Sequence, residues 1–488
     1  MTTQNSDQIF APGRLVISAV DGDASAIYAA ARKQFANAGI VVANTAPVPG
    51  DADATAFTLT DINGTLIDVP KIRELETQLA EIFANLETRE SAFRRTSLSP
   101  ALVVPAPTGP PSSSTTGGPA GDPRTSSAAC EDFQFQLDAA TQSYFDQALA
   151  DKQGRDHSVR VVVLDSSPYG EHPGDFVRHL NDYAFPFVQR FFVNGQPTFH
   201  LRRDTLNPTP WGDGPTDMSQ HGLFIASIIK SIAPDAYVEV VPVLGKSGEG
   251  SLEELTQQIE SLQTDFLPKD AQLLVNVSAT TMVLANLPEM PTWLDELVTK
   301  IQSADERRGI RQTALVEQWH RNGVRAFASE NRRIIAAAGN DGAGGERWWP
   351  GFPARVEGVL SVGAVDGEGR PAEYSNLCRI PGGLSADATD YLRGVFEVDS
   401  NGIYVSGGTQ RSGIVGLFLA RQFESDPAMR NECGSALWSG TSFATAIATG
   451  YMAWLCLQGM TAAEAYQTML ALPATADDGG PILQAEQA

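Results

Sequence analysis

Beyond Glu131, continuous apolar runs alternate with stretches of helical pattern. Such runs are typical of strands buried on both faces, as in a parallel sheet flanked by helices on each side. The pattern therefore predicts an α/β domain over residues 131–488. The predicted strands are VRVVVLD (159–165), AYVEVVPVL (236–244), AQLLVNVS (271–278), RRIIAAAG (332–339) and GVLSVGAV (358–365), and residues 291–331 have a long helical pattern.

The N-terminal part of the chain has a mixed pattern over residues 13–95. Strand patterns at RLVISAV, IVVANTA and TAFTLTDING accompany helical patterns at ASAIYAAARKQFANAG and IRELETQLAEIFANLE. This β-α-β-β-α order predicts a small α+β domain over residues 1–100. Residues 101–130 are rich in Pro, Gly and Ser and have few large apolar side chains, so we expect a flexible linker there.

Charge and composition narrow the class of protein. The net charge of −23 disfavours a nucleic acid or an anionic membrane surface as a partner. The apolar stretch 437–457 contains five hydroxyl residues and is a poor membrane anchor. The N-terminus does not resemble a signal peptide, and the four cysteines are too sparse for a disulfide framework. We therefore expect a cytoplasmic protein with reduced thiols.

Four polar residues lie where parallel α/β sheets gather active groups, at the ends of predicted strands or the starts of predicted helices. Each alone has a structural explanation as a cap or turn residue. Together they supply the parts of a serine hydrolase: a nucleophile, a base, a carboxylate that orients the base, and an amide donor for the oxyanion. They are Asp165, His221, Asn340 and Ser442.

The chain from about residue 131 to its end resembles the subtilisin-like serine proteases, or subtilases. The similar blocks are VVVLDSSP, QHGLFIASII, IIAAAGNDG, FPARVEGVLSVGAVDGEGRPAEYSN and SGTSFATAIATG. The order Asp, His, Ser is also that of subtilisin. The resemblance implies a subtilisin-like parallel sheet flanked by helices on both faces. It also implies a serine endopeptidase with the triad Asp165, His221 and Ser442, and with Asn340 in the oxyanion hole.

Two further stretches resemble the edges that bind an extended peptide in this family, where small residues admit backbone pairing. In VLGKSGEGS the corresponding residues are Gly248, Glu249 and Gly250, and in NVSATTM they are Ser278, Ala279 and Thr280.

Three positions depart from the family pattern. Ala446 stands where many subtilases have proline, Ser167 where glycine is usual, and Ala279-Thr280 where Leu-Gly is familiar. None of these differences removes a catalytic group, so we expect activity. They leave the cleavage specificity open.

The resemblance also bears on cofactors and partners. We expect no required cofactor and no metal ligands; calcium is a structural ion in many subtilases, but no acidic loop here has recognisable ligand spacing. The expected partners are a polypeptide substrate and the chain's own N-terminal domain, whose element order is similar to that of inhibitory propeptides. Three alternatives stay open: a sensor or adaptor domain at residues 1–100 that is never removed, a processing protease dedicated to one toxin, effector or precursor peptide, and a catalytically silent peptide-binding protein.

Overall fold

In the computed structural model of this protein, the described residues form a series of ranges separated by gaps. They are residues 10–19, 24–48, 51–67, 71, 72, 74, 75, 78, 79, 96–102, 122–124, 133–152, 157–167, 176, 177, 180–194, 196–202, 217–245, 248, 252–268, 270–280, 322–340, 342, 350–379, 401–408, 413–423, 426, 428–476 and 480–487.

The chain divides into two compact units. One comprises Met1–Val104, Gly250–Leu262 and Asp295–Val324, and the other comprises Pro105–Glu249, Gln263–Leu294 and Arg325–Ala488. The domain boundaries predicted at residues 100 and 130 stay predictions, because most of the chain between them lies outside the described residues.

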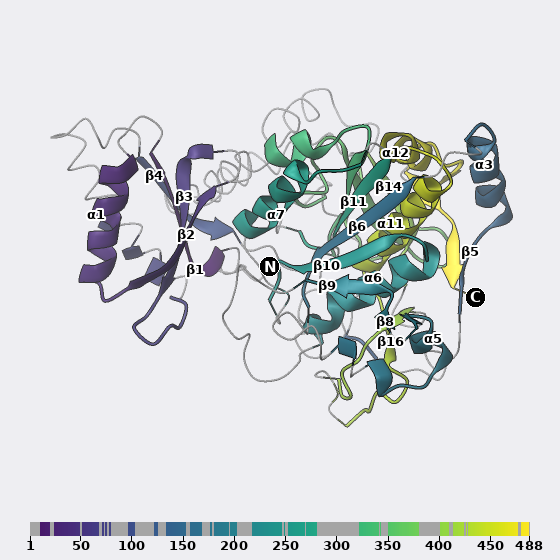
Figure 1. Cartoon of the computed structure of the whole chain (residues 1–488), viewed down its shortest axis with the longest axis horizontal. Coiled ribbons are helices and arrows are strands. Elements are labelled where there is room, and N and C mark those ends of the chain that lie inside the picture. Colours follow the sequence, from purple (N-terminus) through teal and green to yellow (C-terminus); the bar gives the residue numbers. More distant parts are fainter. Residues whose placement is uncertain are drawn as a thin grey trace. The chain divides into compact units, whose positions relative to one another are not determined.

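The first unit contains a four-stranded antiparallel sheet in the order β2-β3-β1-β4, with helix α1 packed on it (Figure 1). Residues of α1 and of the described positions between 71 and 79, which are helical, share one apolar core with the sheet, including Phe35, Leu75 and Phe57. Strand β4, which was not predicted, pairs with β1 and completes a β-α-β-β-α-β order. The elements are β1 (Phe10–Ala19), α1 (Ala24–Asn37), β2 (Val41–Val48), β3 (Asp51–Thr60) and β4 (Thr96–Leu102).

The second unit is built on a nine-stranded sheet in the order β17-β18-β14-β13-β12-β11-β6-β10-β9. All its described pairings are parallel except that of β17 with β18. Its central strands are buried along most of their length, which confirms the predicted parallel sheet. The strands are β6 (Ser158–Asp165), β9 (Phe199–Leu201), β10 (Tyr237–Pro242), β11 (Ala271–Val277), β12 (Arg332–Ala337), β13 (Val359–Val365), β14 (Gly402–Ser406), β17 (Ala474–Thr475) and β18 (Pro481–Leu483).

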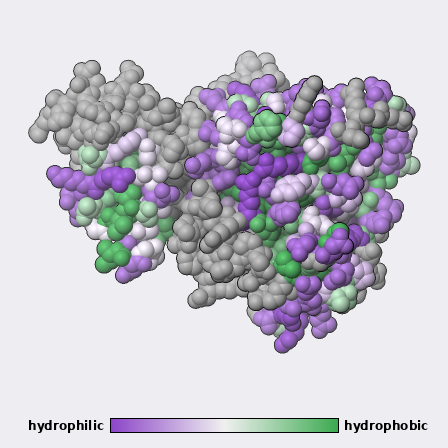
Figure 2. All heavy atoms as spheres, in the orientation of Figure 1, coloured by the Kyte–Doolittle hydropathy of each residue, from purple (hydrophilic) through white to green (hydrophobic). Residues whose placement is uncertain are grey.

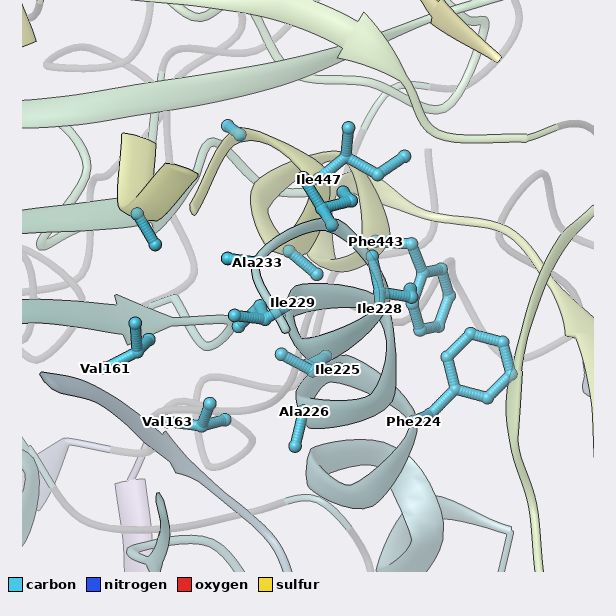
Figure 3. Close-up of a cluster of buried hydrophobic side chains, with 14 of the residues drawn as sticks. Val161, Val163, Phe224, Ile225, Ala226, Ile228, Ile229, Ala233, Phe443 and Ile447 are labelled. Atoms are coloured by element: carbon cyan, nitrogen blue, oxygen red, sulfur yellow. The ribbon is translucent and has the colours of Figure 1, made fainter. Parts of the chain in front are cut away.

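Two apolar helices, α6 (His221–Ile232) and α11 (Thr441–Leu457), pack against each other and against this sheet. In Figure 3, Ala226 and Ile229 of α6 point toward Val161 and Val163 of β6, while the rings of Phe224 and Phe443 lie on the other side of the helix. Each helix begins at the carboxyl-end edge of the sheet, so its first turn lies where the strands end. The fold thus places His221 and Ser442 on that edge.

Shorter elements complete the chain. Helix α3 packs on the far end of α11, with the ring of Phe145 6.1 Å from that of Trp454. Of the predicted helical stretch 291–331, only residues 322–331 are described, and residues 322–327 are helical. The remaining elements are β5 (Phe135–Leu137), α3 (Ala139–Leu149), α5 (Pro186–Gln189), β7 (Phe192–Val193), β8 (Gln196–Pro197), η4 (Met218–Gln220), α7 (Leu252–Thr264), β15 (Ile414–Leu417), β16 (Ser435–Trp438), α12 (Ala462–Leu470) and β19 (Ala485–Gln487).

Hydrophilic side chains cover much of the face shown in Figure 2, and no described helix is both long and apolar enough to cross a bilayer.

The cysteines differ in their oxidation state. Cys378 and Cys456 are buried and belong to no disulfide, whereas Cys433 is disulfide-bonded. The expectation of uniformly reduced thiols is therefore wrong. Cysteine spacing cannot reveal one bond between residues that only the fold brings together.

Candidate active site

Asp165 and His221 form a buried pair at the carboxyl end of β6. Asp165 is 0% exposed, and its Oδ1 and Oδ2 lie 2.9 and 3.1 Å from Nδ1 of His221. Oδ1 also accepts a hydrogen bond of 2.7 Å from the backbone N–H of Ser166. Because an ionised carboxylate can only accept hydrogen bonds, the pair places the imidazole proton on Nδ1 and leaves Nε2 as an acceptor.

Gly222 permits this close approach of helix α6 to strand β6. A Cβ atom added to Gly222 would lie 2.3 Å from the carbonyl oxygen of Ser166 and 2.9 Å from Cβ of Asp165. Both atoms belong to the strand end, so a larger residue would push the first turn of α6 away. The glycine that follows His221 therefore sets the distance between the imidazole and the carboxylate.

Ser442 lies in the first turn of α11, and the residue after it contacts the imidazole. The ring of Phe443, the following residue, is 5.5 Å from the ring of His221. The Ser442 hydroxyl is buried and has no hydrogen-bond partner in the described structure. The structure thus shows that the neighbour of Ser442 contacts the imidazole, and it shows no Ser442–His221 hydrogen bond among the described residues. Such bonds are often long before substrate binds.

Asn340 is held against the same turn of α11. Its Oδ1 accepts hydrogen bonds of 2.9 Å from both the backbone N–H and the hydroxyl of Thr441. Because Oδ1 faces Thr441, the Nδ2 group of the amide is directed to the other side of the Asn340 side chain. The structure therefore brings this predicted oxyanion residue to the residue that precedes Ser442.

An aromatic cluster surrounds the imidazole, and the sequence analysis missed it. Trp438 lies edge to face with His221 at 5.4 Å, and Phe224 contacts both Trp438 and Phe443. Trp438 and Phe443 come from the neighbouring elements β16 and α11, whereas Phe224 comes from α6, which is far from both in the sequence. The sequence signal that could have found them is the aromatic residue next to each catalytic block. The cluster limits the orientations that the imidazole can adopt.

The predicted substrate edges are placed in part. Ser278, Ala279 and Thr280 follow β11 and are buried, and the Ser278 hydroxyl donates to the carbonyl oxygen of Ser442 at 3.3 Å. Gly248 has a φ of 78°, a left-handed conformation that favours glycine. Glu249 and Gly250 lie outside the described residues. Within the described ranges, no cluster of three or more His, Cys, Asp or Glu side chains could hold a metal ion.

Comparison with known proteins decides the family. The model of the subtilase family, Peptidase_S8, matches residues 156–483, which is more than half of the chain. The chain belongs to the subtilase family. Its predicted family and its subtilisin-like α/β fold are thus confirmed.

Individual relatives are more distant. Subtilisin DY of Bacillus licheniformis is 25% identical over 171 residues, which are 33% of this chain and 49% of that protein. The chain therefore spans about half the length of this curated relative.

Three solved structures also resemble this subtilase. The prenylagaramide maturation protease PagA is 24% identical, with a TM-score of 0.32 and coverage of 65% of this chain and 80% of PagA. A cold-adapted subtilisin-like serine proteinase is 15% identical, with a TM-score of 0.37 and coverage of 68% and 90%. The protease domain of PatA is 22% identical, with a TM-score of 0.36 and coverage of 68% and 94%. Because all three TM-scores are low, we draw nothing further from these likenesses.

Proposed function

We propose that this subtilase is a serine endopeptidase that hydrolyses polypeptides through an acyl-enzyme on Ser442. The observation that carries the proposal is the buried Asp165–His221 pair, with the turn that bears Ser442 packed against its imidazole through Phe443. A peptide-binding protein without activity would need neither a buried carboxylate nor an imidazole oriented by it.

The residues have distinct roles in this reaction. Nε2 of His221 accepts the proton of the Ser442 hydroxyl as the oxygen attacks the substrate carbonyl, and Asp165 stabilises the imidazolium that forms. The first turn of α11 directs backbone N–H groups and the positive end of the helix dipole toward the developing oxyanion. The amide of Asn340 supplies a side-chain donor there. His221 then protonates the leaving amine, and water releases the acyl group.

The first unit is proposed to regulate this activity. Its elements follow the order β-α-β-β-α-β, with β4 as the last strand. The inhibitory propeptides of many subtilases have the same order. We therefore favour a prodomain that inhibits the protease until the linker is cut. A sensor domain that is never removed, and a protease dedicated to one partner protein, are the alternatives. A cytoplasmic location stays a prediction, and the disulfide at Cys433 weighs against it.

Hydrolysis of an unfolded polypeptide tests the proposed activity. Purified wild type and Ser442→Ala are incubated with a reduced, alkylated protein substrate, and the products are identified by mass spectrometry. We expect cleavage by wild type and a loss of about 10⁴-fold or more in the variant. Equal product formation by the two proteins would contradict the proposal, because another enzyme would then be responsible.

A further inference from the structure

A buried chain of polar side chains joins helix α11 to strand β11. Thr441, Thr445 and Thr449 stand four residues apart in the helix, so their hydroxyls follow one of its faces. The Nδ2 group of Asn276 in β11 donates to Oγ1 of Thr449 at 2.9 Å. All four residues are 0% exposed. Polar groups without access to water need hydrogen-bond partners inside the protein, so these contacts are strongly constrained.

The helix backbone determines the direction of each hydrogen bond in this chain. The hydroxyl of Thr445 donates to the carbonyl oxygen of Thr441 at 2.7 Å, and that of Thr449 donates to the carbonyl oxygen of Thr445 at 2.8 Å. A hydroxyl has one proton, so Oγ1 of Thr449 can only accept the bond that comes from the strand. The amide of Asn276 must therefore present its NH2 group to Thr449, which leaves Oδ1 for another donor.

The hydroxyl of Ser278 is the donor that reaches this oxygen. Its Oγ lies 3.0 Å from Oδ1 of Asn276 and 3.3 Å from the carbonyl oxygen of Ser442. The two acceptors share one hydroxyl proton, and the Asn276 oxygen is the nearer. Ser278 thus lies between the end of β11 and the residue that bears the nucleophile. Thr449 fixes its position through Asn276.

Ser278 is also the first residue of the predicted substrate edge, residues 278–280. The described pairings of β11 end at Val277, so the Ser278 side chain supports the chain at the point where the sheet ladder stops. An extended substrate pairs with such an edge through its backbone. The edge must therefore lie at a fixed distance from the hydroxyl of Ser442, because the scissile carbonyl has to meet both.

We infer that Thr449 is a positioning residue for the substrate edge at residues 278–280. The inference rests on the proposed function. Thr449 follows Ser442 by seven residues in α11, about 10 Å along the helix, which is too far to touch the reacting atoms. Its hydroxyl oxygen holds Asn276, and Asn276 holds Ser278. The helix that carries the nucleophile at its start thus also sets the place of the edge that receives the peptide.

Thr445 shows what a threonine in this helix does without a partner from the sheet. It makes the same bond to a helix carbonyl as Thr449, and within the described residues its hydroxyl accepts no side-chain hydrogen bond. Valine would fill the same space at either position without a polar atom. The bond from Asn276 is therefore the difference between the two threonines, and Thr445 serves as the matched control.

Thr449→Val and Thr445→Val together test the inference. Both changes remove one bond to a helix carbonyl, but only Thr449→Val leaves the Nδ2 group of Asn276 without its acceptor. We expect kcat/KM for an extended peptide to fall about tenfold in Thr449→Val and to stay within about twofold of wild type in Thr445→Val. Thr449→Ser keeps the acceptor and should recover most of the activity. Thr449→Ala replaces the valine variant if that protein does not fold.

A small active-site probe separates placement of the edge from damage to the triad. A fluorophosphonate reacts with Ser442 without an extended peptide chain, so its rate of labelling depends on the triad and not on the edge. We expect Thr449→Val to be labelled within about twofold of the wild-type rate, with circular dichroism showing that both proteins are folded. Equal losses of labelling and of peptide hydrolysis would overturn the inference, because Thr449 would then act on Ser442 or on the fold.

Ser278→Ala breaks the same chain at its other end. If Thr449 acts through Ser278, the double variant should lose no more activity than about the larger of the two single losses. Losses of kcat/KM that multiply in the double variant would overturn the inference, because the two residues would then act independently.

Failure of this inference is distinct from failure of the proposed function. Wild type that hydrolyses peptides no faster than both Thr449→Val and Thr445→Val would overturn the inference and leave the proposed function intact. Wild type that neither hydrolyses peptides nor is labelled at Ser442 would overturn both. A loss of peptide hydrolysis confined to Thr449→Val, with labelling kept, would support both.

Discussion

The imidazole of His221 is held by side chains from three other elements of the fold. Asp165 of β6 binds Nδ1, Trp438 of β16 lies against one edge of the ring, and Phe443 of α11 packs against it beside Ser442. The hydrogen bond to Asp165 selects the tautomer, and the two aromatic rings restrict rotation. The orientation of the His221 imidazole therefore depends on charge from one neighbour and on packing from the others.

Replacing Asp165 by Asn separates the charge from the shape. The amide fills the same buried space, but it can donate a hydrogen bond to Nδ1 and so favours the wrong tautomer. We expect kcat to fall about 10⁴-fold while the folded structure is kept. Steady-state kinetics on a peptide substrate, together with a circular dichroism melt, measure both. A kcat within tenfold of wild type would contradict the role of Asp165.

Asn340 is predicted to act only when charge develops on the substrate oxygen. Asn340→Ala removes the donor and also the acceptor that binds Thr441. We expect kcat to fall by about 10²–10³ with little change in KM, because the interaction is made in the transition state. Thr441→Val serves as the control for the lost hydroxyl contact, since it keeps the amide of Asn340. An equal loss in both variants would show that Asn340 acts through Thr441.

At the scale of elements, the geometry of the candidate site depends on how α6 and α11 pack against the sheet.

Sequence patterns predicted the strands β6, β10, β11, β12 and β13, because buried parallel strands are apolar throughout. The same patterns missed β14, β15, β16 and β18, which are only three to five residues long, and three of them contain Gly or Pro. Chain pattern alone does not distinguish such strands from loops.

The candidate site was predictable to a similar extent. Asp165, His221, Asn340 and Ser442 stand in blocks that resemble the family, and the structure brings each of them to the same edge of the sheet. The aromatic cluster and the Arg124–Leu437 bridge were not predicted. Both join segments distant in sequence, so they exist only as a consequence of the tertiary fold.

Gly222→Ala tests the contact between α6 and β6. The added Cβ would meet backbone and Cβ atoms of the strand end, which cannot rotate away as a side chain could. We expect a lower melting temperature and at least a tenfold lower kcat, because Nδ1 of His221 would move away from Asp165. Gly367→Ala is the control, since its added Cβ would have nothing within 4 Å. An equal loss of activity in Gly222→Ala and Gly367→Ala would contradict this account.

The turn after β13 provides a pH-dependent element of stability. Partial burial raises the pKa of Asp366, but backbone N–H groups of Glu368 and Arg370 and the Arg370 guanidinium outweigh it, so that the pKa is lowered overall. A lowered pKa means that the unfolded chain binds the proton more readily. The stabilisation is therefore present at neutral pH and is lost as the pH falls through the folded-state pKa.

Asp366→Asn should accordingly destabilise the protein by about 1 kcal/mol or less at pH 7, since the site is only partly buried. The difference from wild type should shrink as the pH is lowered below about 4. Urea unfolding at pH 7 and at pH 3 measures both values. A difference that grows in acid would contradict the assignment of sign.

At the scale of the whole molecule, a subtilase unit shares one chain with a smaller unit of β-α-β-β-α-β order. Residues 122–124, in the segment predicted as a linker between the corresponding domains, are anchored on β16, directly upstream of the turn that bears Ser442. Both partners of this bridge belong to the second unit.

Covalent labelling of Ser442 is the most direct test of the central claim, which is that the triad is assembled. Purified protein is treated with a fluorophosphonate probe before and after cleavage of the linker, and the modified peptide is mapped by mass spectrometry, with Ser442→Ala as control. We predict that cleaved wild type is labelled at Ser442, that the variant is not labelled, and that uncleaved protein reacts more slowly. Absence of label from Ser442 in the cleaved protein would contradict the account.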